Sequence, residues 1–319
     1  MPITTRVLVT GGAGFIGSNL ADELIKRGAK VRIVDNFLTG FRENLDEISG
    51  DFDFIEADVA DADAVKKAVE GVEIVFHQAA LPSVPRSVDD PLETHNACVN
   101  GTFNILNAAR DAGVKRVIYA ASSSAYGDQQ TLPKVETMRP EPLSPYAAAK
   151  LAGELYCAVF AQVYGLETFA LRYFNVFGPR QNPSSQYSGV ISRFIDAFMK
   201  NGTPVIYGDG LQSRDFTYIA NVVDANIKAA EATAGIGEVM NVANGERVSL
   251  LELVDVMKQV TGRTDIEVDF QPERTGDVKH SQADNTRAKE WLGYEKLVGL
   301  EEGIKRTIDW WQSSRFAKQ

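Results

Sequence analysis

Short runs of β-branched and other apolar residues alternate with amphipathic stretches through the first half of the chain. The runs lie at residues 6–10, 30–35, 52–56, 73–77, 116–121 and 167–172. A repeated order of strand, helix and strand is typical of βαβ units, whose strands form a parallel sheet. We therefore predict a doubly wound parallel α/β sheet for this part of the chain.

Helical spacing of apolar residues marks the segments between these runs. It recurs between the first two strands, and Gly28 stands where that helix would end. Longer helices are predicted at 91–112 and 145–164. Ser144 is suited to cap the second of them, and Pro145 to occupy its first turn.

The pattern changes after residue 180. Residues 181–189 are polar and rich in Ser, Asn and Pro, which predicts a long loop. The helices predicted beyond it, with short strands between them, lie at 190–200, 221–232, 249–261 and 300–311. We therefore predict two domains: residues 1–180, with elements returning to them near 215–245, and a smaller mixed α/β domain of residues 181–319.

The composition is that of an ordinary globular protein, with 44 % hydrophobic and 24 % charged residues among 319. Lys and Arg number 33 and Asp and Glu number 43, which gives a net charge of −10. This charge repels phosphate backbones, so we expect no nucleic-acid partner. No run of about 18 apolar residues and no charged leader is visible, so we expect neither a membrane span nor an export signal.

The chain contains two cysteines, Cys98 and Cys157. They cannot build a disulfide framework, and neither belongs to a Cys-x-x-Cys pair or stands in a His cluster. His77, His95 and His280 share no spacing typical of metal ligands either, and we expect them to be packed or hydrogen-bonded. We predict a cytoplasmic protein without a metal site.

A glycine-rich turn follows the first predicted strand and opens the first helix. It places Gly11, Gly14 and Gly17 three residues apart. A backbone without side chains can approach a pyrophosphate, and the helix N-terminus offers it unpaired N–H groups. Asp35 ends the second strand, where a carboxylate can hold a ribose hydroxyl. These features predict a dinucleotide site on a Rossmann-type sheet, with a glycine turn that binds no ligand as the alternative.

Asp35 also bears on which dinucleotide binds. Its carboxylate would repel a 2′-phosphate, and the next basic residue, Arg42, lies further along the chain, so we predict NAD rather than NADP. Asp58 and Val59, after the third strand, have two interpretations. They could meet the adenine edge, or Asp58 could cap a helix over residues 60–69.

Three serines and a Tyr–Lys pair follow in the chain. Ser122, Ser123 and Ser124 lie at the carboxyl end of a predicted parallel strand, where open α/β sheets bind ligands. Tyr146 and Lys150 are four residues apart on a predicted helix, so they share one face. Lowering the pKa of a phenol from about 10 to about 7 takes roughly 4 kcal/mol, much of which an ammonium and an oxidised nicotinamide can supply. The pair thus predicts a general base, although its spacing alone also arises by chance.

The order of these motifs resembles that of the extended short-chain dehydrogenase/reductase family over nearly the whole chain. Its nucleotide-sugar branch is further matched by HQAA at 77–80, LRYFNVFGPR at 171–180, GDG at 208–210 and SRDF at 213–216. Within that branch the best match is to 4-epimerases of UDP-N-acetylglucosamine and UDP-N-acetylglucosaminuronate. It is carried by residues 83–87, 121–128, 132–136, 143–146 and 276–284.

The candidate cofactor contacts combine the glycine turn with strand-end positions that the resemblance implies for NAD. They are Gly11, Gly14, Phe15, Ile16, Gly17, Asp35, Asn36, Gly40, Asp58, Val59, Gln78, Ala79, Ala80, Tyr146, Lys150 and Val176.

The resemblance likewise implies contacts to a UDP-sugar substrate. They are Ser83, Ser122, Ser123, Ser124, Tyr146, Asn175, Gln181, Gly189, Val190, Tyr207, Arg214, Arg274, Asp277 and Ser281. Arg214 and Arg274 look like diphosphate ligands, in keeping with the forked binding of phosphate by guanidinium groups, with a plain surface arginine as the alternative. Asp277 looks like a ribose contact. Ser281 looks like the small residue that leaves room for an N-acetyl arm.

The resemblance implies an NAD-dependent 4-epimerisation of a UDP-sugar through a transient 4-keto intermediate. Tyr146 would take the proton of the 4-hydroxyl, Lys150 would hold the tyrosine acidic, and Ser122 and Ser123 would bond the reacting oxygen. The expected substrate is UDP-N-acetylglucosamine with its galacto epimer, or the uronate forms. UDP-glucose or UDP-glucuronate is the alternative.

Two other activities are more remote. Dehydratases and decarboxylases of this branch carry an acidic residue just after the serine at this strand end, where this chain has Ser-Ser-Ala. A non-catalytic dinucleotide sensor would keep the fold without the chemistry, and the presence of Ser122, Tyr146 and Lys150 argues against it.

Two positions depart from the family pattern. Pro82 stands where a close pattern has Gly, which would stiffen one wall of the sugar pocket. Cys98 stands where Asn is frequent, and its expected role is packing as a small hydrophobe.

A homodimer is also expected from the resemblance, through the helices at 91–112 and 145–164. Val159 and Phe160 would suit such an interface, and burial within the monomer explains the same pattern equally well.

Overall fold

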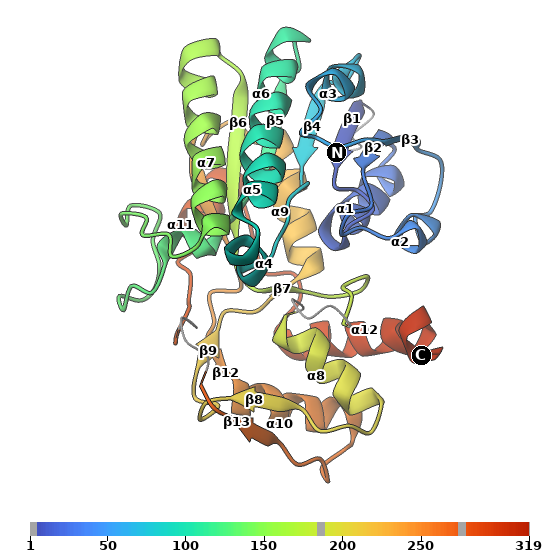
Figure 1. Cartoon of the computed structure of the whole chain (residues 1–319), viewed down its shortest axis with the longest axis vertical. Coiled ribbons are helices and arrows are strands. Elements are labelled where there is room, and N and C mark those ends of the chain that lie inside the picture. The colour runs from blue at the N-terminus through green and yellow to red at the C-terminus, as the bar shows by residue number, and fades with distance from the viewer. Residues whose placement is uncertain (1–4, 184–188, 274–278, 319) are drawn as a thin grey trace.

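Seven parallel strands form the main sheet of the protein. The structure, a computed structural model, describes residues 5–183, 189–273 and 279–318. The strand order is β11-β6-β5-β4-β1-β2-β3 (Figure 1). The strands are β1 (Arg6–Thr10), β2 (Lys30–Asp35), β3 (Asp53–Glu56), β4 (Ile74–His77), β5 (Arg116–Ser122), β6 (Glu167–Tyr173) and β11 (Val239–Val242). The six predicted strands are confirmed to within one residue at each end, and with them the Rossmann-type α/β class.

Helices cover both faces of this sheet. They are α1 (Phe15–Lys26), α2 (Arg42–Asp46), α3 (Ala62–Val69), α4 (Val84–Asp89), α5 (Pro91–His95), α6 (Gly101–Asp111), α7 (Pro145–Tyr164), α9 (Ile219–Glu231) and α11 (Thr286–Leu292). Val7 and Val9 of β1 pack into the core that contains α1 and α9, whereas Leu8 packs into the core that contains α3, α6 and α7. Strands buried on both faces are continuous apolar runs, which is why the sequence pattern located them.

The two long helices differ in regularity. α7 has the predicted bounds, and the Ser144 hydroxyl accepts a hydrogen bond from the Ala147 N–H at 3.2 Å, as an N-cap does. The single helix predicted at 91–112 is instead interrupted, because Asn96–Asn100 form a π turn between α5 and α6. Such turns within helices are frequent at functional sites.

The second part of the molecule lies below the sheet in Figure 1. Its helices α8 (Val190–Met199), α10 (Leu250–Thr261) and α12 (Leu300–Ser313) match three predicted helices within two residues. The predicted helix at 221–232 is α9, which covers the main sheet. The short strands pair as β7 (Val176–Phe177) with β10 (Thr217–Tyr218), β9 (Ser213–Arg214) with β12 (Val248–Ser249), and β8 (Val205–Tyr207) with β13 (Asp269–Gln271). Two single turns, η2 (Ser123–Tyr126) and η3 (Arg315–Lys318), complete the described elements.

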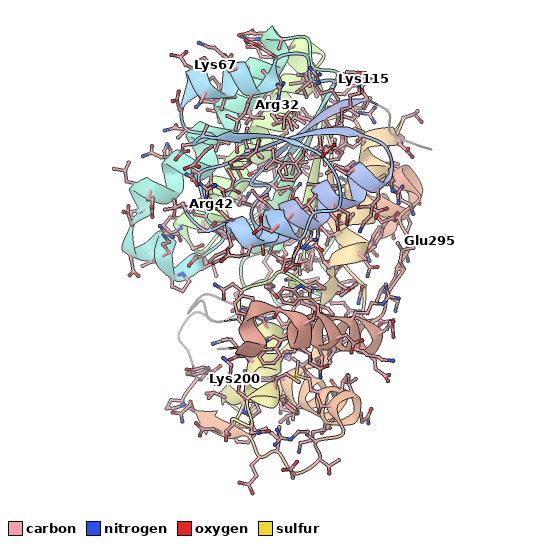
Figure 2. All side chains as sticks on the ribbon, turned by 90° about the vertical axis from the view of Figure 1, so that its right-hand side faces the viewer. Arg32, Arg42, Lys67, Lys115, Lys200 and Glu295 are labelled. Carbon is pink, nitrogen blue, oxygen red and sulfur yellow. The ribbon has the colours of Figure 1, made fainter. Side chains whose placement is uncertain are left out.

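The two parts share one hydrophobic core. The core on the α1 side of the sheet continues into the second part through Phe194 of α8, Leu253 of α10 and Trp311 of α12. Figure 2 shows both parts from the side, with Lys67 on the larger and Lys200 on the smaller part. Apolar burial therefore holds the smaller part against the larger.

A buried arginine adds a polar link between the parts. Arg180, just after β7, donates a hydrogen bond to the Ser18 carbonyl oxygen of α1 at 2.9 Å. Its guanidinium also pairs with the carboxylates of Asp22 and Glu47. The segment that leaves the sheet is thereby fixed to the helix that follows the glycine turn.

In the described part of the chain we looked for membrane-spanning helices, metal-binding groups and disulfides. No helix there is long and apolar enough to cross a bilayer. No group of three or more His, Cys, Asp or Glu side chains within the described ranges is placed to hold a metal ion. Cys98 and Cys157 are buried and unpaired.

Candidate active site

Two loops meet where the strand order of the main sheet reverses. β1 and β4 are neighbours in the sheet, and Gly11 follows β1 while Gln78 and Ala79 follow β4. Open α/β sheets bind ligands outside the carboxyl ends of the strands at such a point. Gly11 has a φ of +68°, and a Cβ atom at this position would lie 2.8 Å from Ala79. Only glycine permits this approach.

The first helix begins directly at this turn. A Cβ atom on Gly17 would overlap the carbonyl oxygen of Gly11, so glycine at 17 lets α1 close on the turn. Gly14, the N-cap of α1, contributes no side chain to cap the first N–H groups. A helix N-terminus of this kind suits an anionic group such as the diphosphate of a dinucleotide.

Asp35 ties the glycine turn to the end of β2. Its carboxylate is buried and accepts hydrogen bonds from the backbone N–H groups of Ala13, at 2.9 Å, and Phe37, at 2.8 Å. Burial raises the pKa of Asp35, and these N–H donors oppose the rise. Gly40 packs against it, since a Cβ there would lie 2.9 Å from a carboxylate oxygen of Asp35.

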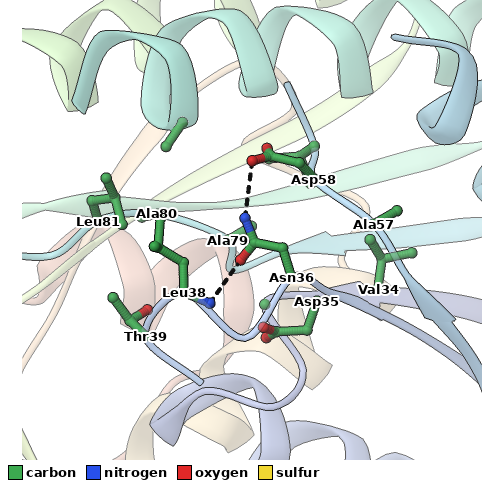
Figure 3. A pocket seen from close by; sticks show the side chains of 13 residues that line it. Val34, Asp35, Asn36, Leu38, Thr39, Ala57, Asp58, Ala79, Ala80 and Leu81 are labelled. Carbon is green, nitrogen blue, oxygen red and sulfur yellow. Dashed lines mark hydrogen bonds between the residues drawn. The ribbon is translucent and has the colours of Figure 1, made fainter. Parts of the chain in front are cut away.

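A cavity that is partly open to solvent lies beside these residues (Figure 3). Its lining includes seven predicted cofactor contacts: Gly11, Asp35, Asn36, Asp58, Val59, Ala79 and Ala80. It also includes residues that were not predicted: Val34, Leu38, Thr39, Ala57, Leu81 and Ala97. Leu38 and Thr39 directly precede the predicted Gly40, and this proximity is the signal that could have found them.

Asp58 faces this cavity and does not cap α3. It accepts a hydrogen bond from the Asn36 side-chain amide at 2.9 Å, as Figure 3 shows. The N-cap of α3 is Asp61, whose carboxylate accepts from the N–H groups of Asp63 and Ala64. The capping interpretation of Asp58 was therefore wrong, because α3 begins at Ala62 rather than at residue 60.

The next basic residue in the chain after Asp35 is bonded outside the cavity. Arg42 pairs with Glu56 at 2.6 Å and lies over the ring of Phe37, 4.2 Å from its centroid. The carboxylate of Asp35 thus faces the cavity while the charge of Arg42 is compensated at its edge. This arrangement favours a ribose hydroxyl over a 2′-phosphate.

Strand β5 and helix α7 bring the predicted serine, tyrosine and lysine together. Ser122 ends β5. Its hydroxyl interacts with the phenol of Tyr146 and accepts a hydrogen bond from the Ser124 hydroxyl at 2.9 Å. Lys150 lies one turn beyond Tyr146 and is buried. Its ammonium donates to the Ala120 carbonyl oxygen at 2.8 Å. Ser123 begins the η2 turn next to this cluster.

Burial shifts the pKa values of this cluster in opposite directions. It raises the pKa of Tyr146, and the hydrogen bond with Ser122 opposes the rise. It lowers the pKa of Lys150, and the carboxylate of Glu154, one turn further along α7, opposes that fall. Glu154 itself forms a buried ion pair with Arg172 at 2.7 Å. A buried Tyr–Lys pair with perturbed pKa values is typical of proton transfer at a functional site.

A buried hydrogen-bond chain connects the cofactor loops with the π turn. His77 at the end of β4 bonds Thr10 at 2.8 Å and Thr102 at 3.0 Å, and Thr102 donates to the Cys98 carbonyl oxygen at 2.6 Å. Burial and the charge of Lys150 lower the pKa of His77 to about 3. His77 is therefore neutral and serves as a hydrogen-bonding bridge, and Cys98 contributes packing and a backbone carbonyl.

A second cavity, of about 230 Å³, lies in the smaller part of the molecule. Six predicted substrate contacts line it together with Val176, which was predicted to contact the cofactor. The seven residues are Asn175, Val176, Gln181, Gly189, Val190, Tyr207 and Arg214. The residues missed by the sequence analysis are Phe177, Ile191, Arg193, Val205, Gln212, Phe216 and Leu250. Phe216 closes the matched SRDF segment and Gln212 adjoins it, so their proximity to Arg214 was an available signal.

The surroundings of this cavity are positively charged. Arg214 donates hydrogen bonds to the carbonyl oxygens of Ser213 and Lys279, both at 3.1 Å. Burial and the charges of Arg247, Lys279 and Arg214 lower the pKa of His280. Cations at this density suit an anionic ligand such as a diphosphate.

Ser281 stands beside Asn175, whose side-chain amide donates to the Ser281 hydroxyl at 3.3 Å. Asn175 has a φ of +35°, which asparagine tolerates better than most residues. Arg274 and Asp277 lie outside the described residues.

The side chains of several other predicted contact residues bond to or pack against the protein itself. Ser83 caps α4 by accepting from the Arg86 N–H at 3.1 Å. The Gln78 side chain is bonded to Asn226 and Tyr173, and its backbone N–H donates to the Thr10 carbonyl oxygen at 3.2 Å. Phe15 and Ile16 pack against the core beside α1.

The profile of one protein family covers most of the chain. The NAD dependent epimerase/dehydratase family matches residues 7–243. The chain belongs to this family. It is an enzyme family that works with NAD, and the glycine turn, Asp35 and the cavity beside them fit that cofactor.

Three relatives illustrate the similarity. The chain is 41% identical over 312 residues to a UDP-glucose 4-epimerase of Mycolicibacterium smegmatis, covering 97% of this chain and 99% of the relative. It is 40% identical to the UDP-N-acetylglucosamine 4-epimerase of Methanobrevibacter ruminantium, solved with UDP-N-acetylmuramic acid, with a TM-score of 0.93 over 98% of this chain and 99% of the other. The UDP-glucuronic acid 4-epimerase of Bacillus cereus, solved with UDP-glucuronic acid and NAD, is 31% identical, with a TM-score of 0.88 over 97% of this chain and 99% of the other.

Replacing Asp35 by Ala should make the protein lose NAD. Hydrogen bonds to charged groups contribute about 1.5–3 kcal/mol, so affinity should fall roughly tenfold or more. The measurement is the NAD released on denaturing the purified protein. Glu56→Gln removes a carboxylate that pairs with Arg42 outside the cavity and should retain NAD. Equal NAD content in both variants would contradict the assigned role of Asp35.

Proposed function

We propose that this NAD-dependent UDP-sugar 4-epimerase interconverts UDP-N-acetylglucosamine and its galacto epimer, or the corresponding uronates. The observation that carries the proposal is the cluster of Ser122, Tyr146 and Lys150, in which the serine hydroxyl interacts with the phenol and the lysine lies one helical turn away. The cavity beside the glycine turn is the proposed NAD site, and the second cavity, with its basic surroundings, is the proposed sugar-nucleotide site.

Tyr146 is the proposed acid and base of the reaction. Its phenolate takes the proton of the sugar 4-hydroxyl and later returns one to the epimeric alcohol. The hydroxyl groups of Ser122 and Ser123 bond the reacting oxygen, and the charge of Lys150 favours the phenolate over the phenol. NAD, held at the glycine turn and Asp35, would supply the hydride acceptor and donor for C4 of the sugar.

The sugar must turn between the two half-reactions while its nucleotide stays bound. We assign Arg214 to the diphosphate, because its guanidinium borders the second cavity among other cations. Arg274 and Asp277 are proposed as the matching diphosphate and ribose contacts. Anchoring the UDP half allows rotation about the diphosphate without loss of the intermediate.

The proposed N-acetyl preference depends on Ser281. A small side chain there, hydrogen-bonded to Asn175, leaves space that a larger one would fill. UDP-glucose or UDP-glucuronate is the alternative substrate, since these sugars need no such space. The stiff Pro82 next to Ser83 would narrow the sugar pocket and favour that alternative.

Dehydration and decarboxylation have less support. Ala125 follows the serine run and is buried, so the turn after β5 offers no carboxylate at that position. A further acid or base is needed for either reaction.

The two proposed binding sites lie in different parts of the chain, which suggests that each domain binds one ligand. We propose that residues 1–180, with the elements returning near 215–245, bind NAD, and that residues 181–319 bind the sugar nucleotide. The protein would work in the cytosol, where thiols such as Cys98 and Cys157 stay reduced.

A homodimer is proposed from the apolar surface of α7. Leu155, Val159 and Val163 are 62%, 48% and 63% exposed, and Phe103 of α6 is 41% exposed beside them. Phe160, expected at such an interface, is buried within the monomer against Phe103. An exposed apolar stripe of this size fits an interface with a second copy.

Replacing Tyr146 by Phe should reduce epimerisation by about 10²- to 10⁴-fold, because the general base is lost. Bound NAD should remain, since the phenol hydroxyl does not hold the dinucleotide. Turnover is measured by incubating the holoenzyme with UDP-N-acetylglucosamine and following the galacto isomer. Tyr164→Phe, on the exposed end of the same helix, is the matched control and should keep full activity.

Substantial turnover by Tyr146→Phe would contradict the assigned base. Absence of product from the unmodified holoenzyme with every UDP-sugar of a panel would favour the non-catalytic sensor.

Replacing Ser281 by Tyr should reduce activity on UDP-N-acetylglucosamine more than activity on UDP-glucose. The ring would fill the space left for the N-acetyl group, so kcat/KM for UDP-N-acetylglucosamine should fall at least about tenfold more than that for UDP-glucose. Ser281→Ala should retain both activities. Equal loss for the two sugars would show that residue 281 does not face the C2 substituent.

Replacing Val159 by Asp should convert the dimer to a monomer, because an interface cannot bury an unpaired carboxylate at low cost. The molar mass in solution, from light scattering, is the readout. Val205→Asp on β8 is the control, at a site that is also partly exposed. A monomeric mass for the unmodified protein would exclude the proposed dimer.

A further inference from the structure

Asp215 is a fully buried carboxylate between β9 and β10 for which the proposed chemistry gives no role. Its two oxygens accept hydrogen bonds from three backbone N–H groups. The donors are Asn244 at 3.0 Å, Gly245 at 3.0 Å and Ala283 at 3.1 Å. The carboxylate thus joins two segments that are distant in the chain, the turn after β11 and the segment that follows residue 279.

Backbone dipoles balance the charge of Asp215. The three N–H groups lower its pKa, while the carboxylate of Glu246 and the much larger effect of burial raise it to about 7. The other titratable group that interacts with it is the phenol of Tyr294. Glu246 is in turn paired with Lys296. Burial of the carboxylate is costly unless its hydrogen bonds are kept, so the three N–H groups are held close to it.

The segments joined by Asp215 carry the candidate substrate contacts. The preceding residue is Arg214, and the backbone oxygen of Asp215 accepts from the Asn175 side chain at 3.0 Å. Ser281 lies two residues before the donor Ala283, and its N–H bonds the Ser213 carbonyl oxygen at 3.0 Å. Asp215 is therefore bonded, directly or through neighbouring residues, to the segments that carry Arg214, Asn175 and Ser281.

We propose that Asp215 is a positioning residue that, in its carboxylate form, clamps the sugar-nucleotide cavity in the geometry that binds UDP-sugar. The inference rests on the proposed function, because it takes a UDP-sugar as the occupant of that cavity. Asp215 does not touch the ligand; it holds the segments of Arg214, Asn175 and Ser281 together.

Protonation would open this clamp. A carboxylate accepts all three N–H groups, whereas a carboxylic acid presents an O–H donor toward one of them. The neutral form thus leaves a buried N–H group without an acceptor, and the two segments separate. Binding competence then follows the fraction of Asp215 that is ionised.

Affinity for a UDP-sugar should therefore weaken as the pH falls. With a pKa near 7, the ionised fraction drops about tenfold between pH 8 and pH 6, and the apparent Kd should rise by the same factor. UDP-glucose and UDP-N-acetylglucosamine are diphosphate diesters whose charge does not change over this range. The dependence must then come from the protein.

The test is calorimetric titration of the NAD-loaded protein with UDP-glucose and with UDP-N-acetylglucosamine at pH 6, 7 and 8. Asp215→Asn should bind at least about tenfold more weakly than the unmodified protein at pH 8 and no better than it at pH 6, with no pH dependence of its own. Its bound NAD should be unchanged. Asp215→Glu, which restores the charge, should recover part of the affinity at pH 8.

Two controls separate Asp215 from other groups. Asp269→Asn removes an exposed carboxylate from β13 and should leave the pH series unchanged. His280→Gln removes the titratable group bonded to Ser213 and should retain the pH dependence. Loss of the dependence in His280→Gln would assign it to the histidine and overturn the proposal.

The outcome for Asp215 can be told apart from that for the proposed function. A pH-independent Kd in the unmodified protein, or equal Kd values for it and Asp215→Asn at pH 8, overturns the clamp even if the protein epimerises UDP-sugars. Should Asp215→Asn fail to fold, the pH series of the unmodified protein alone decides. A pH-dependent Kd without turnover would sustain the clamp and refute the epimerase.

Discussion

The close packing of helix α7 on strand β5 is the contact on which the candidate chemistry depends. A Cβ atom on Gly153 would overlap the hydroxyl of Tyr119, so glycine at this position lets the helix lie directly on the strand. The Tyr119 hydroxyl donates to the Lys150 carbonyl oxygen at 3.2 Å, and the Lys150 ammonium donates to the Ala120 carbonyl oxygen at 2.8 Å. Helix and strand are thereby locked in one register, which sets Tyr146 beside Ser122.

Local electrostatics differ from the overall charge of the protein. The chain carries a net charge of −10, yet both proposed ligands are anionic diphosphates. In our proposal, backbone N–H groups at the glycine turn bind one of them, and Arg214 binds the other, with the charges of Lys279 and Arg247 in the same region. Neither site needs a broad basic surface, because charge is placed at short range where screening is weak.

Short-range hydrogen bonds and ion pairs also account for the buried polar groups around the two sites. His77 is neutral and bridges Thr10 and Thr102. Glu154, which is paired with Arg172, opposes the fall in the pKa of Lys150 that burial causes. The carboxylate of Asp215 accepts hydrogen bonds from three backbone N–H groups. Each of these groups holds neighbouring segments in place, while other residues provide the atoms proposed to contact the ligands. Such supporting contacts make a binding site rigid.

The sequence by itself determined the features that depend on neighbours in the chain. The six strands, α7 with its Ser144 cap, and the glycine turn followed from local periodicity and from the backbone freedom of glycine. Motif order indicated which chemistry to look for. Only the tertiary structure decided that Asp58 faces the cavity while Asp61 caps α3, and that Phe160 is buried while Val159 is exposed. It alone brought Asn175, Arg214 and Ser281 around Asp215, because contacts between residues far apart in the chain are fixed by packing and leave no periodic trace in the sequence.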